Sequence, residues 1–207
     1  MFSFGRKTLL AVVAVLMFFG LTINAEAKEI RVGYLVADQL HFPAIMVMKE
    51  RNMLEKEGYT VKWSEFLAGS YVMQEMASGS LDFVSCGAVP ISISHAQGVK
   101  INILASGNQE GSALVVGRDV NSIKDLEGKK IGTPGTGSIQ DAMVAQLLKD
   151  NNVNARRMSM KVSDMPLFLD KGEISAFVAW QPHCARAVAN NFGKILYTSH
   201  DMMPGHQ

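Results

Sequence analysis

The feature that most restricts the fold of this chain is the regular alternation of short apolar runs with amphipathic segments. In the first half, the apolar runs have the length of buried strands. The segments between them end at glycines, and two of the three begin at a proline, Pro43 or Pro90, as helices do. The predicted strands are 30–36, 61–66, 82–86 and 101–105, and the predicted helices are 43–56, 69–79 and 90–98. Strands and helices in this order form mostly parallel sheets with helices on both faces. We therefore expect an α/β fold.

The same order of strands and helices repeats in the second half of the chain. The predicted strands begin at 114 and continue at 130–132, 158–162, 176–179 and 195–197, and the predicted helices are 122–126, 139–152, 164–171 and 182–191. Because the scheme runs twice, we expect two α/β lobes, 28–110 and 111–207, with a boundary near Gln109 to Gly111. Helices that follow strands begin beyond the carboxyl ends of those strands, where open α/β sheets bind ligands. Two such lobes facing each other would enclose a cleft.

The most glycine-rich stretch, Gly132-Thr133-Pro134-Gly135-Thr136-Gly137-Ser138, joins a predicted strand to a predicted helix. Ser138 and Asp141 have the spacing of a capping box, and glycines let the backbone turn tightly and approach a ligand. The N–H groups at such a helix start favour an anion or another polar group. The spacing is neither that of a P-loop nor that of the dinucleotide-binding fingerprint. Two interpretations stay open, a cradle for a polar ligand and a plain strand-to-helix turn.

The first 27 residues have the pattern of a secretory signal peptide. Arg6 and Lys7 precede an apolar run at 9–23, and Ala25-Glu26-Ala27 is a small-x-small cleavage site, so we expect cleavage after Ala27. An uncleaved membrane anchor is the competing interpretation, although the apolar run is short for a membrane span. The sequence therefore predicts export, with no membrane insertion after cleavage.

Charge and metal-ligating residues argue against several functions. The formal net charge of the whole chain is +1, and removing Arg6 and Lys7 with the signal peptide changes it to −1. A near-neutral balance of scattered charges does not support binding of nucleic acid or of a membrane surface. Cys86 and Cys184 are the only cysteines, and neither Cys-x-x-Cys nor His-x-x-x-His occurs. We therefore expect no metal site and no cofactor.

Several segments of the mature chain carry a family resemblance when they are taken together in their order and spacing. They are Arg31-Val32-Gly33-Tyr34, His41-Phe42-Pro43-Ala44 with the following "VMKERNMLEKEG", then "MASGSLDFVSCGAVP", "SIKDLEGKKIGTPGTGS" and "FVAWQPHCARA". The chain resembles type II periplasmic substrate-binding proteins of ABC importers, in the nitrate/sulfonate/taurine (NMT1/THI5-like) group. The chain differs from that group because it ends at Gln207, within the expected second lobe. The usual return to the first lobe and the C-terminal helices are missing from it.

The resemblance implies a function as well as a fold. It implies a two-lobed, venus-flytrap protein of the periplasm that closes on a small polar or anionic solute, such as a sulfonate, taurine or nitrate. The closed form would deliver the solute to the membrane subunits of an ABC permease. A monomer without catalytic activity is expected.

The predicted ligand-binding residues share one property, which is that they lie in loops after predicted strands or at the starts of predicted helices. In the first lobe they are Asp38, Gln39, His41, Phe42, Gly69, Ser70, Ser85, Cys86 and Gly87. In the second lobe they are Thr136, Gly137, Ser138, Trp180 and Gln181. The second-half arginines are predicted to lie away from these loops, which argues against a doubly charged solute; they are Arg118, Arg156, Arg157 and Arg186.

Several of these residues also have a purely structural interpretation. His41 either contacts the solute or packs against the first helix, and Ser70 is interpreted as a helix cap that can also donate to a ligand. Cys86 is interpreted as a buried small side chain near the cleft, and Trp180 as a cleft wall. We interpret His183-Cys184 as part of a helix surface.

Two other functions are compatible with the same fold. One is an enzyme of the THI5-like pyrimidine-synthesis type, although the chain lacks the cysteine-rich run of those enzymes and is predicted to be exported. The other is a sensory module that presents a ligand to a receptor.

Overall fold

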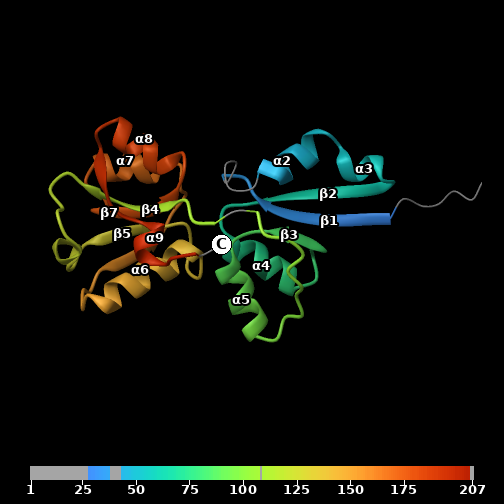
Figure 1. The fold of residues 1–207 in the computed structure, drawn as a ribbon, viewed down its shortest axis with the longest axis horizontal. Coiled ribbons are helices and arrows are strands. Elements are labelled where there is room, and N and C mark those ends of the chain that lie inside the picture. The colour runs from blue at the N-terminus through green and yellow to red at the C-terminus, as the bar shows by residue number, and fades with distance from the viewer. Residues whose placement is uncertain (1–27, 38–42, 108, 206–207) are drawn as a thin grey trace, which may run out of the picture.

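The computed structural model describes residues 28–37, 43–107 and 109–205, and its strands form two separate sheets (Figure 1). The predicted signal peptide at 1–27 lies outside the described residues. The first sheet contains β1 (Lys28–Leu35), β2 (Tyr59–Phe66) and β3 (Phe83–Ser85) in the order β2-β1-β3, and both strand pairs are parallel. We call this sheet and its helices the first lobe.

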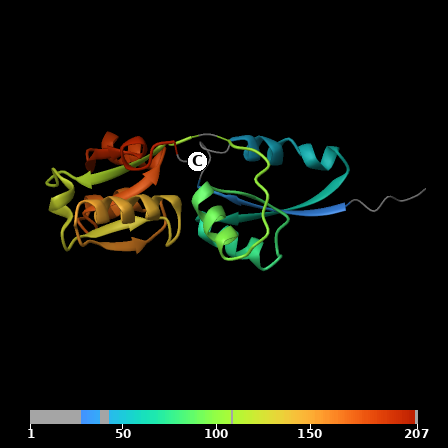
Figure 2. The same cartoon turned by 60° about the horizontal axis from the view of Figure 1, so that its bottom comes forward.

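Helices cover both faces of the first sheet, as Figures 1 and 2 show. The helices α2 (Pro43–Glu50) and α3 (Met53–Lys56) lie on one face, and α4 (Gly69–Ala77) and α5 (Ala88–Ala96) lie on the other. The core of this lobe lies beneath α4 and α5, where Leu35, Val72, Met73 and Leu81 are buried. Gly33 permits this close packing, since a methyl group at its position would lie 2.6 Å from both Leu81 Cδ1 and Val72 Cγ2.

The helix α2 has no fully buried residue, and polar contacts hold it to the sheet instead. The hydroxyl of Tyr34 on β1 donates to Glu65 Oε1 on β2 over 2.5 Å, and Lys49 Nζ on α2 donates to the same hydroxyl over 2.5 Å. The Lys49 ammonium also lies 4.9 Å from the centre of the Tyr34 ring. One buried tyrosine therefore connects the helix to two strands.

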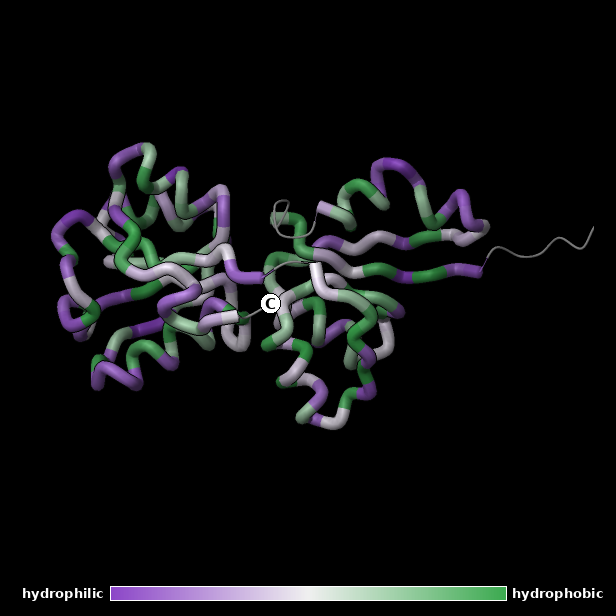
Figure 3. Tube along the Cα trace, viewed as in Figure 1, coloured by the Kyte–Doolittle hydropathy of each residue, from purple (hydrophilic) through white to green (hydrophobic). Residues whose placement is uncertain are grey.

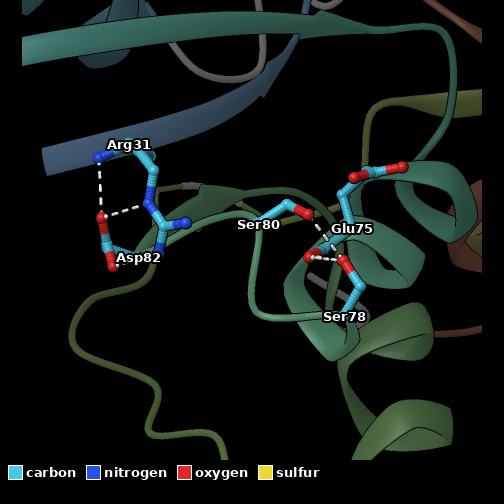
Figure 4. A network of polar contacts seen from close by, with 5 residues as sticks. All are labelled: Arg31, Glu75, Ser78, Ser80 and Asp82. Atoms are coloured by element: carbon cyan, nitrogen blue, oxygen red, sulfur yellow. Dashed lines mark hydrogen bonds and ion pairs between the residues drawn. The ribbon is translucent and has the colours of Figure 1, made fainter.

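The turn between α4 and β3 is held by polar contacts that Figure 4 shows. Arg31 donates to Asp82 from its backbone N–H and its Nη2 over 2.8 Å each and from its Nε over 3.0 Å. Ser78 Oγ donates to the carbonyl oxygen of Glu75 over 2.8 Å and lies 2.7 Å from Ser80 Oγ. These contacts fix the start of β3 beside β1.

The second sheet contains five strands in the order β6-β5-β7-β4-β8 within the described residues. β5 pairs in parallel with β6 and β7, whereas β4 is antiparallel to β7 and β8. The strands are β4 (Ser112–Gly117), β5 (Lys130–Thr133), β6 (Arg156–Ser159), β7 (Ala176–Trp180) and β8 (Gly193–Thr198). The helices are η1 (Ile123–Leu126), α6 (Ile139–Asp150), α7 (Met165–Asp170), α8 (His183–Ala189) and α9 (Ser199–Met202). We call this sheet and its helices the second lobe.

The strand β4 is buried on both faces, which explains its continuous apolar sequence. Leu114 and Val116 pack in the cluster that includes α6, and Ala113 and Val115 pack in the cluster that includes α7 and α8. Figure 3 shows the corresponding hydropathy, with hydrophobic residues along the inner strands and hydrophilic ones at the outer turns. The second lobe therefore has three layers, with the sheet between two groups of helices and an apolar cluster on each face of the sheet.

Three predicted elements differ from the structure, and one of them, the strand predicted at 158–162, is shifted to β6 (Arg156–Ser159). The predicted helix at 43–56 is divided into α2 and α3, because Asn52 adopts a left-handed conformation with φ of 48°. The predicted strand at 101–105 does not form, and Ile103 and Leu104 are 66% and 76% exposed. An apolar run becomes a strand only where the edge of a neighbouring strand supplies backbone hydrogen-bond partners.

The lobe boundary near Gln109 to Gly111 stays a prediction, although the described strands fall on either side of it.

Candidate functional site

The glycine-rich turn connects β5 to α6 and is held together by side chains at the start of the helix. Ser138 is the N-cap, and its Oγ accepts a hydrogen bond from the backbone N–H of Asp141 over 3.1 Å. The Asp141 carboxylate in turn accepts from the N–H of Gly137 over 3.1 Å. Gly137 has a φ of +78°, which a glycine adopts without strain. The N-cap predicted at Ser138 is thus confirmed, but the other half of a capping box does not form, because the Asp141 carboxylate accepts from Gly137 N–H and not from Ser138 N–H.

The backbone N–H groups of this turn donate within the chain. Thr136 N–H donates to Ser159 Oγ over 3.2 Å, and Ser138 N–H donates to the carbonyl oxygen of Gly135 over 3.0 Å. The Gly137 N–H is occupied by Asp141. This differs from the expectation that these N–H groups face a solute, because a carboxylate of the chain itself occupies the helix start. The roles of Thr136, Gly137 and Ser138 in binding stay predictions.

Arg157 on β6 pairs with that carboxylate. Its Nη1 lies 2.5 Å from Asp141 Oδ1 and donates to the Asp141 carbonyl oxygen over 3.2 Å. The Asp141 side chain is 9% exposed and the Arg157 side chain 37%. The expectation that Arg157 lies away from the site loops is therefore wrong. No local signal could have found this pair, because the strand pairing of β6 places Arg157 beside α6.

The first lobe faces this turn with the start of α4. A methyl group on Gly135 would lie 3.4 Å from Ser70 Oγ and 3.4 Å from Ala68 Cβ, and one on Gly137 would lie 3.9 Å from Ser70 Cβ. The N-cap of α4 is Ala68, so the interpretation of Ser70 as a cap is wrong. Its Oγ is buried and has no hydrogen-bond partner among the described residues. A buried hydroxyl without a partner is a donor and acceptor available to a ligand.

The end of β3 and the start of α5 lie beside the start of α4. A methyl group on Gly69 would lie 2.7 Å from Pro90 Cγ and 3.4 Å from Cys86 Cβ. Cys86 is 8% exposed, and this burial raises the pKa of its thiol to about 12. The interpretation of Cys86 as a buried small side chain is therefore confirmed. Ser85 ends β3 and Gly87 is the N-cap of α5. Four predicted binding residues of the first lobe therefore lie together where β3 ends, namely Gly69, Ser85, Cys86 and Gly87.

Trp180 and Gln181 are used in contacts of the chain itself. Trp180 is 2% exposed, and its indole Nε1 donates over 3.1 Å to the carbonyl oxygen of Ala37 in the first lobe. Gln181 Oε1 accepts from the N–H of Ala185 over 2.9 Å, at the start of α8. Cys184 is fully buried, and desolvation raises the pKa of its thiol to about 11, so its interpretation as a surface residue is wrong. Ligand contacts of Trp180 and Gln181 stay predictions.

A pocket of about 200 Å³ lies between α4, α5 and the glycine-rich turn. Its lining combines hydroxyl and amide side chains with apolar ones. The lining residues are Ser70, Met73, Gln74, Ala77, Pro90, Ile93, Ser94, Gln97, Thr136 and Gly137. Sequence reasoning missed Gln74, Ser94 and Gln97, since only the tertiary arrangement brings the later turns of α4 and α5 to the site. The predicted site residues Asp38, Gln39, His41 and Phe42 lie outside the described residues.

The segment that connects the lobes is tied to the end of the described chain. Glu110 and Gly111 have φ angles of 62° and 94°. Glu110 Oε1 lies 2.8 Å from His200 Nδ1 and accepts from the N–H of Gly205 over 3.2 Å. The hydrogen bond to Glu110 raises the pKa of His200. The connection between the lobes is therefore anchored to α9 by a contact that strengthens when His200 is protonated.

The described parts of the chain contain no group of three or more His, Cys, Asp or Glu side chains placed to hold a metal ion. Within them, no helix combines the length and the apolar character needed to cross a membrane.

Comparison with known proteins identifies relatives among binding proteins. Residues 24–206 match the model of the NMT1-like family. The taurine-binding periplasmic protein of Escherichia coli (strain K12) is 26% identical over 200 residues, which cover 94% of this chain and 59% of that protein. The putative aliphatic sulfonates-binding protein of Bacillus subtilis (strain 168) is 27% identical over 221 residues, which cover 92% and 61%. The chain thus spans about 60% of the length of these relatives.

The fold is shared with solved binding proteins. The alkanesulfonate-binding protein SsuA from Xanthomonas axonopodis pv. citri, bound to MOPS, superposes with a TM-score of 0.69 at 19% identity, covering 84% of this chain and 62% of that one. At this identity the likeness shows the fold alone. It confirms the predicted α/β fold of type II periplasmic binding proteins.

Proposed function

The chain belongs to the NMT1-like family, and on that basis we propose that it is an exported, periplasmic solute-binding protein that serves an ABC permease. It captures a small polar or anionic solute between its two lobes and delivers it to the membrane subunits. The observation that carries the proposal is the placement of Ser70, at the start of α4, opposite Gly135 and Gly137 of the second lobe. A solute in the pocket that Ser70, Thr136 and Gly137 line contacts both lobes at once.

Contact with both lobes gives the solute a way to favour closure. A ligand shifts a conformational equilibrium only by binding one state better than the other, and a solute between the lobes has its full set of contacts only when they are closed. The hinge of this motion is the connection near Gln109 to Gly111, where two successive residues have positive φ. The buried Ser70 hydroxyl supplies a hydrogen bond that replaces part of the solute's lost hydration.

The known relatives support binding rather than catalysis. The named relatives bind taurine or, putatively, aliphatic sulfonates, and their names describe binding proteins. Two of the predicted binding residues, Ser138 and Gln181, are held in place by hydrogen bonds at helix starts, which is suited to preorganised recognition. We therefore propose recognition without a chemical step on the solute.

Titration calorimetry and small-angle scattering on the same purified chain test this function. The solute panel contains taurine, ethanesulfonate, nitrate and small neutral amides. Binding of at least one solute, with a decrease in the radius of gyration, is expected. The absence of both binding and compaction across the whole panel would overturn the proposal.

A pair of serine variants locates the binding event. Ser70→Ala removes the buried hydroxyl and is expected to weaken binding by roughly fivefold to tenfold, the value of one hydrogen bond. Ser80→Ala is the matched control, because Ser80 lies in the same lobe, in the exposed turn that Figure 4 shows. Equal affinities of the two variants would place the solute elsewhere.

A further inference from the structure

We propose that the pocket between α4, α5 and the glycine-rich turn selects an uncharged solute group that both donates and accepts hydrogen bonds, a carboxamide or a sulfonamide, over the anion of the same shape. This inference rests on the proposed function and narrows the class of solute. It is carried by the side chains that line the pocket and by the ion pair behind the turn.

The polar side chains of the pocket are all neutral. Among the described residues that line it, the hydrogen-bonding side chains are hydroxyls and primary amides, and none is a lysine, arginine, aspartate or glutamate. Hydroxyls and amides both donate and accept, so an NH₂ group of a solute finds acceptors and its oxygen finds donors. An anion offers acceptors only. It would also lose its hydration on entering the pocket, and the described lining residues supply no positive charge to compensate for that loss.

The helix start that would otherwise attract an anion is already neutralised by the chain. The Asp141 carboxylate accepts from Gly137 N–H over 3.1 Å, so it occupies the positive end of the α6 dipole. Arg157, the nearby cation, lies 2.5 Å from that carboxylate. A solute anion at Gly137 would therefore meet a buried carboxylate whose cation is already paired.

The buried hydroxyl of Ser70 suits a neutral oxygen of the solute. Ser70 Oγ is buried without a partner and lines the same pocket, so it can donate to the carbonyl or sulfonyl oxygen of a solute. Further along the pocket, Gln97 and Ser94 can accept from the solute's NH₂ group. Met73, Pro90 and Ile93 provide apolar contact for a short carbon chain.

The volume of the pocket suits a small solute. The pocket holds about 200 Å³, which is the liquid volume of about seven water molecules. It is smaller than the roughly 300–1,000 Å³ of pockets for drug-sized ligands. Amides with one to four carbon atoms are therefore the appropriate probes.

Matched pairs of solutes test the inference by titration calorimetry of the purified chain. The pairs are methanesulfonamide with methanesulfonate and propionamide with propionate, which differ in charge but hardly in shape. In every pair of which a member binds, the neutral member is expected to bind roughly tenfold more tightly or better. Its affinity should also be unaffected by added salt, unlike that of an anion.

The outcomes separate this inference from the proposed function. An anion that binds as tightly as its amide, or more tightly, overturns the inference while the solute-binding function stands. If no solute of any class binds, the proposed function and the inference fail together. If the amides bind more tightly, both are supported.

Two variants provide independent readouts. Gln97→Leu is expected to weaken amide binding roughly tenfold, whereas Gln146→Leu, on the exposed side of α6, leaves it unchanged. Asp141→Asn leaves Arg157 without its carboxylate partner, so the ratio of anion to amide affinity should rise roughly tenfold. An unchanged ratio in this variant contradicts the neutralising role of Asp141. Should Asp141→Asn fail to fold, the solute pairs and Gln97→Leu still decide.

Discussion

The indole N–H of Trp180 in the second lobe donates a hydrogen bond to the carbonyl oxygen of Ala37 in the first lobe, 3.1 Å away. Ala37 lies two residues after the end of β1, and Trp180 is the last residue of β7. The contact therefore joins the carboxyl ends of one strand from each sheet, and Trp180 is 2% exposed where it does so. Since open α/β sheets bind ligands at these strand ends, the lobes are coupled beside the proposed site.

Trp180→Phe should loosen this coupling. The change removes the donor and part of the packing of a buried side chain, and it should cost about 1–3 kcal/mol of unfolding free energy in urea. It should also increase the radius of gyration in scattering, because the lobes separate more readily. Trp63→Phe is the control, since Trp63 Nε1 donates within the first lobe, to Glu55 Oε1 over 3.4 Å. Identical scattering from the wild type and Trp180→Phe would contradict the coupling.

Gly137→Val should weaken solute binding while the first lobe remains folded. Gly137 faces Ser70 and Ile93 at 3.9 and 4.0 Å from an added methyl group, so the larger side chain of valine would push the lobes apart. Gly128→Val imposes similar backbone strain, since its φ is +69°, but an added methyl group there meets no atom within 4 Å. Calorimetry should show roughly tenfold weaker binding for Gly137→Val than for Gly128→Val. Equal affinities of Gly137→Val and Gly128→Val would indicate that the glycine-rich turn has only a structural role.

The Arg31–Asp82 pair should make stability dependent on acid pH. Hydrogen bonds from the Arg31 side chain lower the pKa of Asp82 from 3.8 to about 2. A carboxyl group with a lowered pKa in the folded state stabilises the protein above the unfolded value of 3.8, and this contribution is lost as the pH falls towards 2. Asp82→Asn should therefore lower the Tm by a few degrees at neutral pH and flatten its decrease below pH 4. Thermal melts from pH 6 to pH 2 measure this, and Glu173→Gln, at an exposed carboxylate, is the control. An unchanged pH profile for Asp82→Asn would contradict the prediction.

Both thiols should be unreactive in the folded protein. Burial raises the pKa of Cys86 from 9.0 to about 12 and that of Cys184 from 9.0 to about 11. Because the thiolate is the reactive form, iodoacetamide at about pH 8 should modify neither thiol until urea unfolds the chain. Mass spectrometry of the alkylated protein detects the adducts. Rapid labelling of the folded chain would show that one thiol is accessible.

Local signals predicted the elements that depend on a few neighbouring residues. The Ser138 N-cap formed as its spacing indicates. The apolar runs of β4 and β7 became strands buried on both faces. Each of these outcomes depends either on hydrogen bonds within one turn or on the burial of a whole apolar run. Both features involve residues that are close together in the sequence, so a local pattern is enough to predict them.

Predictions that required a distant partner were the ones that failed. The apolar run at 101–105 stayed outside the sheet, and the pairing of Arg157 with Asp141 could not be inferred from either residue's neighbours. Ser70 was predicted as a cap, but its hydroxyl faces the second lobe instead. In each case the outcome depends on which residues, distant in the sequence, lie next to the segment in the folded chain.

The sequence by itself thus determined the α/β class, the repeated strand and helix order, and the position of the glycine-rich turn at a helix start. Only the tertiary structure decided what that turn can bind, because the Asp141 carboxylate, the paired Arg157 and the opposing Ser70 hydroxyl reach it from α6, β6 and α4. Helix caps are set by bonds between residues a few positions apart. The charge of a binding site is a sum over side chains that come together only when the sheets are formed.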